Sequence, residues 1–321
     1  MAQTIVTFDT AHSGTIHDAQ LDYYGKRLAT ASSDASIRVW DVSTEQHNIL
    51  AEIREHTAPV WQVSWSHPKF GSLLASASYD KQVIICREIR QGDWQPLYRD
   101  NSHTGSVNAI CWSPWEFGLN LAAASTDGSV SIISNKGGDK WSKKTIANAH
   151  VYGVNAVSWC PATSPATLAS GPAVVAEQQQ LQGNQPSQKI VTGGCDNLVK
   201  IWRLDEQTGD EWVEIHRFDN HTEWVRDVAW RPNVGIPSHT IASCSEDRSV
   251  IIWSQEMDGQ PWRMHAKLEL PAPVWRVSWS VTGSILAAAC GDNTVQLFKE
   301  TTDNEWVPVT SFNEQGVAAQ G

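Results

Sequence analysis

Several features that would indicate particular classes of protein are missing from this 321-residue sequence. It has no apolar run of about 18 residues that could span a membrane, and its first residues, MAQTIVTFDTAH, have neither the basic nor the apolar region of a signal peptide. The six cysteines stand singly, without a CxxC pair, which argues against a zinc site or a disulfide framework. We therefore expect a cytosolic or nuclear protein with free core thiols, no metal and no cofactor.

Clusters of basic residues are also missing. The chain has 24 Lys and Arg against 35 Asp and Glu, which gives a formal charge of -11, and neither sign forms a long block. Because affinity for a phosphate backbone depends on clustered Lys and Arg, we expect no direct nucleic-acid partner. The glycine-rich pieces NKGGDKW and TGGCD lack the spacing of a P-loop, and we interpret them as turns.

What the sequence has in abundance is tryptophan, with 17 residues, and their positions reveal an internal repeat. Each of six units has an Asp that follows a strand-like segment such as LASASYD and precedes an alternating strand such as QVIIC. These residues are separated by 46, 47, 69, 51 and 45 positions. They are Asp34, Asp80, Asp127, Asp196, Asp247 and Asp292.

A period near 45 with four short strands per unit is typical of a WD-repeat β-propeller. We therefore predict an all-β protein whose residues 1–312 form a single six-bladed WD-repeat propeller. The long interval contains a segment rich in Pro, Gln and Ser, which predicts a flexible loop at 162–188 within blade four. We predict a disordered tail at 313–321.

Histidine, serine or threonine, and aspartate recur together and could suggest a hydrolase triad. An enzyme needs one such site rather than several, and in WD repeats these residues join a strand Trp in a buried hydrogen-bond chain. We therefore predict no catalytic residues and structural tetrads in repeats one, four and five. The tetrads comprise His12, Thr30, Asp34 and Trp40; His150, Thr192, Asp196 and Trp202; and His221, Ser243, Asp247 and Trp253.

The count of outer strands leaves one strand over. NEWVPVTSF, at 304–312, supplies the outer strand of repeat six, so TIVTF, at 4–8, has no inner strands of its own. Because open sheet edges are templates for pairing, we hypothesise an open ring that another protein completes with a donated blade. The alternative is a closed six-bladed ring in which TIVTF packs on blade six as a fifth strand or frays. The residues expected to flank the gap are Thr4, Ile5, Val6, Thr7, Phe8, Ile16, Leu21, Val274, Trp275, Val277 and Trp279.

Several tracts resemble the family of the protein transport protein Sec thirteen, and the resemblance covers about residues 5 to 310. They include SWSHPKFGSLLASASYDKQVIIC and HTGSVNAICWSPWEFGLNLAAASTDGSVSII. Pieces such as SPWEFGLNLA lie outside the general repeat consensus, which makes the resemblance specific. The sequence departs from the family at Cys86, where a Trp is expected, and in the loop at 162–188.

The resemblance implies a non-enzymatic scaffold in a hetero-oligomer, with a blade donated by a Sec thirty-one-like subunit of the coat protein complex II outer cage. A nucleoporin of the Y-shaped nuclear pore subcomplex is the second implied donor, and a TOR-regulating complex is a further implied assembly. The implied locations are the cytoplasmic face of the endoplasmic reticulum and coated vesicles, the nuclear envelope at nuclear pores, and the cytosol. Membrane association would come only through the coat.

Two rival functions remain open at this point. One is a related propeller confined to the nuclear pore. The other is a closed substrate-recognition propeller that binds a peptide on its central face, where Trp61, Arg226 and Trp275 begin inner strands.

Overall fold

The structure is a computed structural model that describes residues 8–162, 187–205, 207–208, 211–233, 238–313 and 318–319. The chain forms two compact units, Met1–Asn155 and Ala156–Gly321. Residues 4–7 of the predicted spare strand, and the predicted loop except residues 162, 187 and 188, lie outside the described residues. In the described part of the chain, no helix is long and apolar enough to cross a membrane.

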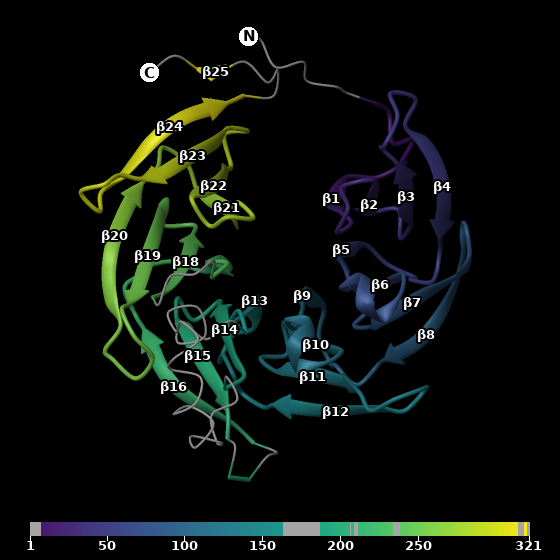
Figure 1. Cartoon of the computed structure of the whole chain (residues 1–321), viewed down its shortest axis with the longest axis horizontal. Helices are drawn as coiled ribbons and strands as arrows, with labels where there is room; N and C mark the ends of the chain where they lie inside the picture. The colour runs from purple at the N-terminus through teal and green to yellow at the C-terminus, as the bar shows by residue number, and fades with distance from the viewer. Residues whose placement is uncertain are drawn as a thin grey trace, which may run out of the picture. The chain divides into compact units, whose positions relative to one another are not determined.

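The first unit holds three antiparallel four-stranded sheets, blades one to three, in which each strand pairs with the next along the chain (Figure 1). Short 3-10 helices, η1 (Pro68–Phe70) and η2 (Trp115–Phe117), follow the first strands of blades two and three. Blade one consists of β1 (Ile16–Leu21), β2 (Arg27–Ser32), β3 (Ile37–Asp41) and β4 (Asn48–Ile53). Blade two consists of β5 (Val60–Trp65), β6 (Leu73–Ser78), β7 (Val83–Arg90) and β8 (Asp93–Asp100). Blade three consists of β9 (Val107–Trp112), β10 (Asn120–Ser125), β11 (Val130–Asn135) and β12 (Trp141–Ile146).

The remaining sheets, blades four to six, lie in the second unit except for the first residues of β13. Blade four consists of β13 (Val154–Trp159), β14 (Lys189–Gly194), β15 (Val199–Leu204) and β16 (Trp212–Phe218). Blade five consists of β17 (Val225–Trp230), β18 (His239–Ser245), β19 (Ser249–Gln255) and β20 (Arg263–Glu269). Blade six consists of β21 (Val274–Trp279), β22 (Ile285–Cys290), β23 (Val295–Glu300), β24 (Trp306–Phe312) and β25 (Ala318–Ala319). The prediction of six blades is confirmed.

The fifth strand of blade six departs from the sequence predictions in two ways. β25 pairs with the outer strand β24, where Phe312 lies opposite Ala318. The predicted tail at 313–321 therefore contributes a short strand at residues 318–319. A fifth strand on blade six was expected only as an alternative, and from TIVTF rather than from the C-terminal residues.

The repeat Asp residues build the turns between the second and third strands. In all six blades the Asp Oδ1 accepts the backbone N–H of the residue two positions later, at 2.9–3.2 Å. The intervening residue has a positive φ in every case, from 63° at Ala35 to 84° at Gly128. Because an Asp side chain that bonds its own turn stabilises this conformation, the Asp fixes the register of each hairpin.

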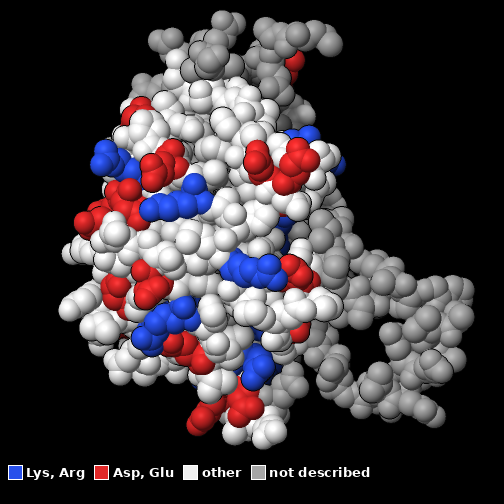
Figure 2. Space-filling view, turned by 90° about the vertical axis from the view of Figure 1, so that its left-hand side faces the viewer, with Lys and Arg blue, Asp and Glu red and all other residues white. Residues whose placement is uncertain are grey.

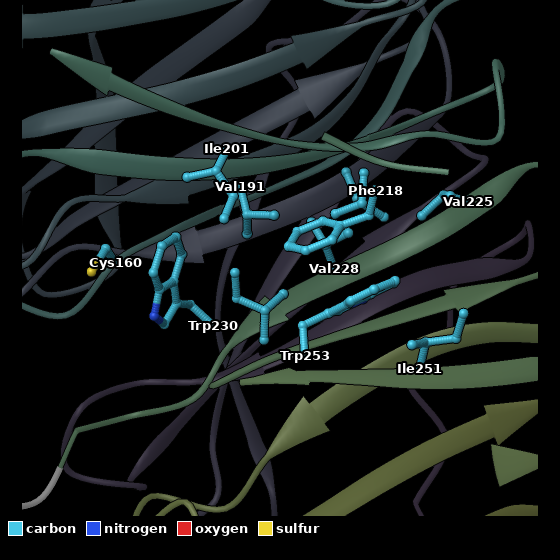
Figure 3. Close-up of a cluster of buried hydrophobic side chains, with 12 residues drawn as sticks. Cys160, Val191, Ile201, Phe218, Val225, Val228, Trp230, Ile251 and Trp253 are labelled. Carbon is cyan, nitrogen blue, oxygen red and sulfur yellow. The ribbon is translucent and has the colours of Figure 1, made fainter. Parts of the chain in front are cut away.

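Neighbouring blades pack face to face through apolar side chains from alternate strand positions. In each blade we call the face toward the preceding blade the leading face and the opposite face the trailing face. The trailing face of blade four meets the leading face of blade five around Val191, Ile201, Trp230 and Trp253 (Figure 3). Similar clusters join blade one to two, two to three and five to six. Each blade therefore needs neighbours to bury both of its faces.

Four of the six cysteines, Cys86, Cys160, Cys244 and Cys290, are buried, as predicted for core thiols, whereas Cys111 and Cys195 are partly exposed. Burial raises the pKa of Cys86 and of Cys160 to about 12, so neither thiol ionises near neutral pH. On the face shown in Figure 2, basic and acidic side chains are interspersed.

Candidate partner-binding surfaces

The predicted tetrads of blades one and five are assembled as buried hydrogen-bond chains. In blade five, His221 lies between Asp247, 2.9 Å from Nδ1, and Ser243, 2.8 Å from Nε2, and Trp253 donates to the same Ser Oγ at 3.0 Å. In blade one the corresponding chain is formed by His12, Asp34, Thr30 and Trp40, with distances of 2.9–3.4 Å. These chains tie the segment before the first strand to the Asp turn.

Hydrogen bonds of the same kind are also present in blades two, three and four. In blade four, Trp202 Nε1 donates to Thr192 Oγ1 at 3.0 Å. In blade two, His56 bonds Asp80 and Ser76, while Cys86 stands in place of the Trp. Blade three contains a substitution that the repeat pattern did not predict. There Ser131, from the third strand β11, supplies the hydroxyl to His103 Nε2 at 2.9 Å, because Ala123 cannot.

The electrostatics of these chains favour ionised aspartates. Burial raises the pKa of Asp80, but hydrogen bonds from His56, Thr57 and Gln82 outweigh it and lower the pKa to about 2. The same balance of burial against stronger hydrogen bonds also lowers the pKa of Asp34, Asp127 and Asp247. The His and Asp side chains of blades two and five are almost fully buried, so a substrate could not reach them. Their role in the structure is to fix the turns.

Blade one differs from its neighbours in the exposure of its leading face. Ile16, the first residue of β1, is 41% exposed, whereas the equivalent Val60 and Val107 of blades two and three are fully buried. Leu21, at the end of the same strand, is 57% exposed. The burial of Val60 and Val107 comes from the trailing face of the preceding blade. Within the first unit, blade one has no preceding blade.

Blade six shows the complementary exposure on its trailing face. Val295, the first residue of β23, is 36% exposed, whereas the equivalent Val199 and Val250 of blades four and five are fully buried. Ala287, Ala289 and Leu297 on the same face are half-buried. Among the positions compared, the apolar side chains are therefore exposed on the leading face of blade one and on the trailing face of blade six. The sequence contained the signal for Val295, because the residue three positions after every repeat Asp is apolar.

Phe8, the last residue of the predicted spare strand TIVTF, packs on the leading face of blade one. Its ring lies edge-on to Trp40, with centroids 5.3 Å apart. In the second unit, Phe218 ends the outer strand of blade four and packs on Trp253 of blade five, with centroids 4.0 Å apart. Phe8 thus occupies on blade one the place that the outer strand of a preceding blade occupies on blade five. This position favours the interpretation of TIVTF as the outer strand of an incomplete blade.

The residues predicted for the blade-six side of the gap fall into two groups. Val274 and Val277 are buried in the cluster with blade five, and Trp279 packs against that cluster and donates to Ala229 O at 3.1 Å. These three side chains therefore contact blade five rather than an uncovered surface, because they lie on the leading face of blade six. Trp275 is 45% exposed.

The three residues proposed for a central peptide-binding face already have partners. Trp61 Nε1 donates to Ser106 Oγ at 2.9 Å. The Arg226 guanidinium pairs with Glu246 and lies 4.8 Å from the ring centroid of Trp275. The Trp61 indole N–H and the Arg226 guanidinium are therefore already engaged within their own units.

Comparison with known proteins shows which family the chain resembles. The family model described as "WD domain, G-beta repeat" matches residues 3–41, 47–86, 212–254 and 265–299, and "Anaphase-promoting complex subunit 4 WD40 domain" matches residues 69–162. A "Protein SEC13 homolog" of Dictyostelium discoideum is 54% identical over 93% of this chain and 95% of its own length. "Protein transport protein SEC13 homolog A" of Arabidopsis thaliana and "Protein transport protein sec13" of Schizosaccharomyces pombe are each 56% identical over 94% of this chain and 97% of their own lengths.

The repeated turns, the tetrads and the matching models define a WD-repeat β-propeller protein. Its similarity to these relatives over nearly their whole length narrows the assignment. The chain belongs to the SEC13 family.

Proposed function

We propose that this chain is a non-enzymatic scaffold in protein transport, and that a partner donates a blade to its open ring. The transport role follows from relatives that are named protein transport proteins. The donated blade is supported by the exposure of two apolar faces, the leading face of blade one and the trailing face of blade six.

The free energy of burying apolar side chains makes these two blade faces strong candidates for partner binding. Full burial of a Val, Leu or Ile side chain contributes about 1.5–3 kcal/mol, and both faces carry side chains of this kind at positions that interior blades bury completely. A blade inserted by a partner would cover both faces and pair with the spare N-terminal strand, residues 4–8. We expect such an interface to exceed the roughly 1,600 Å² of a standard protein–protein interface.

The proposed partners are a Sec thirty-one-like subunit of the coat protein complex II outer cage and a nucleoporin of the Y-shaped nuclear pore subcomplex. A TOR-regulating complex is a further proposed assembly. The chain would then work at the cytoplasmic face of the endoplasmic reticulum, on coated vesicles, at nuclear pores and in the cytosol. Its stiff blades would join the helical solenoid of a partner and resist bending of a cage edge.

The test is affinity purification from cytosol, with partners identified by mass spectrometry. The baits are the intact chain, a form without residues 1–10, and Leu21→Asp, which places a charge on the exposed leading face of blade one. Val281→Asp is the matched control, because Val281 lies on an exposed turn of blade six outside both faces. Thermal melting of each bait checks that it is folded.

We expect the intact chain and the control to retain large solenoid proteins of the coat or the nuclear pore, and the other two baits to lose them. Recovery of ubiquitin-ligase or chromatin proteins that survive both changes would support the closed substrate-recognition propeller instead. Recovery of nuclear pore proteins alone would support the pore-restricted alternative.

A further inference from the structure

A row of largely exposed aromatic side chains crosses the three blades of the first unit, outside the buried clusters that join them. We call it the aromatic ladder, and its members are Tyr24, Tyr23, His67 and Trp115. Their ring centroids follow one another at 5.3, 5.0 and 5.7 Å. Tyr23 is 67% exposed and Trp115 is 41% exposed. Burial in the core therefore does not explain these rings.

The ladder is built by sequence tracts that the WD repeat does not require. His67 and Trp115 belong to SHPKFG and SPWEFG, which connect the first and second strands of blades two and three. Each tract forms a 3-10 helix, η1 or η2, that ends in a glycine with φ near +88°. These are the non-generic tracts of the sequence, and neither the tetrads nor the uncovered blade faces use them.

One ring of the ladder has a fixed orientation and a fixed tautomer. His67 Nδ1 accepts the backbone N–H of Lys69 at 3.2 Å, because His67 caps η1. In the neutral imidazole the proton therefore lies on Nε2, which is a hydrogen-bond donor. The imidazole also stacks on Trp115 with an interplanar angle of 29°. Lys69 Nζ lies 4.3 Å from the centroid of the same indole ring.

The surface of the ladder offers rings and hydrogen-bond donors together. The Tyr23 and Tyr24 hydroxyls, the His67 Nε2 proton and the Trp115 indole can all donate. Asp22, the carboxylate beside the tyrosines, is already engaged by Arg27 and by two backbone N–H groups. Glu116 is the exposed carboxylate next to Trp115, and Lys26 and Lys69 are exposed cations on the same loops. A fitting ligand therefore presents apolar rings and acceptors.

A pocket at one end of the ladder supports the same conclusion. It has a volume of about 160 Å³ and is lined by Tyr23, Tyr24, Trp65 and Pro68, among others. The Arg27 guanidinium covers the Trp65 ring at 4.7 Å. The rings share the wall with polar residues, among them Arg27, Ser66 and Ser72, so a pocket of this size accommodates one small residue that has both apolar and hydrogen-bonding groups.

We propose that the aromatic ladder binds a proline-rich segment of another protein in the polyproline II conformation. Such a segment presents pyrrolidine rings and carbonyl acceptors, and its prolines have no N–H to satisfy. Aromatic-lined grooves recognise this conformation because it is ordered before binding. The centroid distances of 5.0 Å from Tyr23 to His67 and 5.7 Å from His67 to Trp115 limit the row to the span of three to four polyproline II residues, which rise about 3.1 Å each.

The test is calorimetric titration of the full chain with an acetylated, amidated deca-proline peptide. The comparison peptides are an equally long Gly-Ser repeat and an amphipathic helical peptide. We expect saturable binding of deca-proline alone. Tyr23→Ala and Trp115→Ala should each weaken it roughly tenfold or more. The matched control is Trp224→Ala. Trp224 directly precedes β17 of blade five, in the second unit, and is about as exposed as Trp115. The affinity of this variant should equal that of the wild type.

A second measurement on the wild-type chain keeps the proposal independent of how the variants fold. Deca-proline should shift the ¹⁵N–¹H indole resonance of Trp115, identified by its loss in Trp115→Phe, and leave the Trp224 resonance in place. Equal binding of the Gly-Ser peptide, preference for the helical peptide, or shifts confined to other tryptophans would each overturn the proposal. The donated-blade proposal uses different surfaces, so either can fail alone.

Discussion

Two strands with the same chemistry, β6 in blade two and β22 in blade six, are buried to different extents. β6 reads LLASAS and is buried at all six positions. β22 reads ILAAAC and alternates between half-buried and buried residues. The buried positions of β22 face blade five, whereas the half-buried positions lie on the trailing face. The difference shows that the number of neighbouring blades, not the composition of a strand, sets the burial of its side chains.

The strongest test of this comparison places a charge at equivalent positions of an interior and a terminal blade. Val60→Asp would bury an unpaired carboxylate between blades one and two, and we expect it to cost more than about 4 kcal/mol or to prevent folding. Ile16→Asp, at the exposed equivalent position, should cost less than about 1 kcal/mol. Urea unfolding of the isolated chain measures both. Equal destabilisation would mean that the leading face of blade one is covered in solution.

A second pair compares the two aromatic residues that end an outer strand. Phe218 is buried and stacked on Trp253, so Phe218→Ala should lower the free energy of unfolding by about 3 kcal/mol. Phe8 is half-buried on Trp40, so Phe8→Ala should lower it by about 1–2 kcal/mol. A loss at Phe8 as large as that at Phe218 would indicate that the N-terminal strand is already part of a packed blade without a partner.

The sequence predicted the parts of this fold that depend on local chemistry. The six Asp turns, the alternating strands and the complete hydrogen-bond chains of blades one and five follow from residue type and spacing. It was harder to predict which blade face a side chain lies on, because the sequence pattern places both Val274 and Val295 in strands without distinguishing their faces. Which of them is buried depends on the direction of the pleat relative to blade five, and sequence periodicity alone does not give that direction. Ser131 was missed because the hydroxyl comes from a different strand than in the other repeats.

A third pair of substitutions removes the serine hydroxyl from blade five and adds one at the equivalent alanine of blade six. Ser243 of β18 pairs with Val228 of β17 in blade five. Ala288 of β22 pairs in the same way with Val277 of β21 in blade six. Ser243→Ala leaves His221 and the Trp253 indole without an acceptor or donor partner, so we expect a loss of about 2 kcal/mol. Ala288→Ser is the matched control and should give no stabilisation, because blade six has Leu270 in place of the histidine. Thermal melting measures both, and a stabilising Ala288→Ser would contradict this account.

The smallest expected effect is the pH dependence of the interior His–Asp pairs, and Asp80 in blade two provides its clearest case. In the folded chain the pKa of Asp80 is lowered to about 2, because hydrogen bonds from His56 and two backbone groups outweigh the effect of burial. The unfolded value is about 3.9. Since the folded pKa is the lower one, the stabilisation is complete above about pH 4 and is lost as the pH falls toward about 2.

Asp80→Asn removes this titration and therefore isolates its contribution. At pH 7 the variant should be less stable than the wild type by about 1–2 kcal/mol, and the gap between the two should narrow as the pH falls from about 4 to about 2. Urea unfolding across this pH range measures the difference in the free energy of unfolding between the two proteins. A gap that stayed constant would show that Asp80 acts only through its turn hydrogen bonds, as Asp292 does with Thr294 in the terminal blade. A narrowing gap would assign part of the stability of blade two to the ionised pair that blade six, with Leu270 in place of the histidine, cannot form.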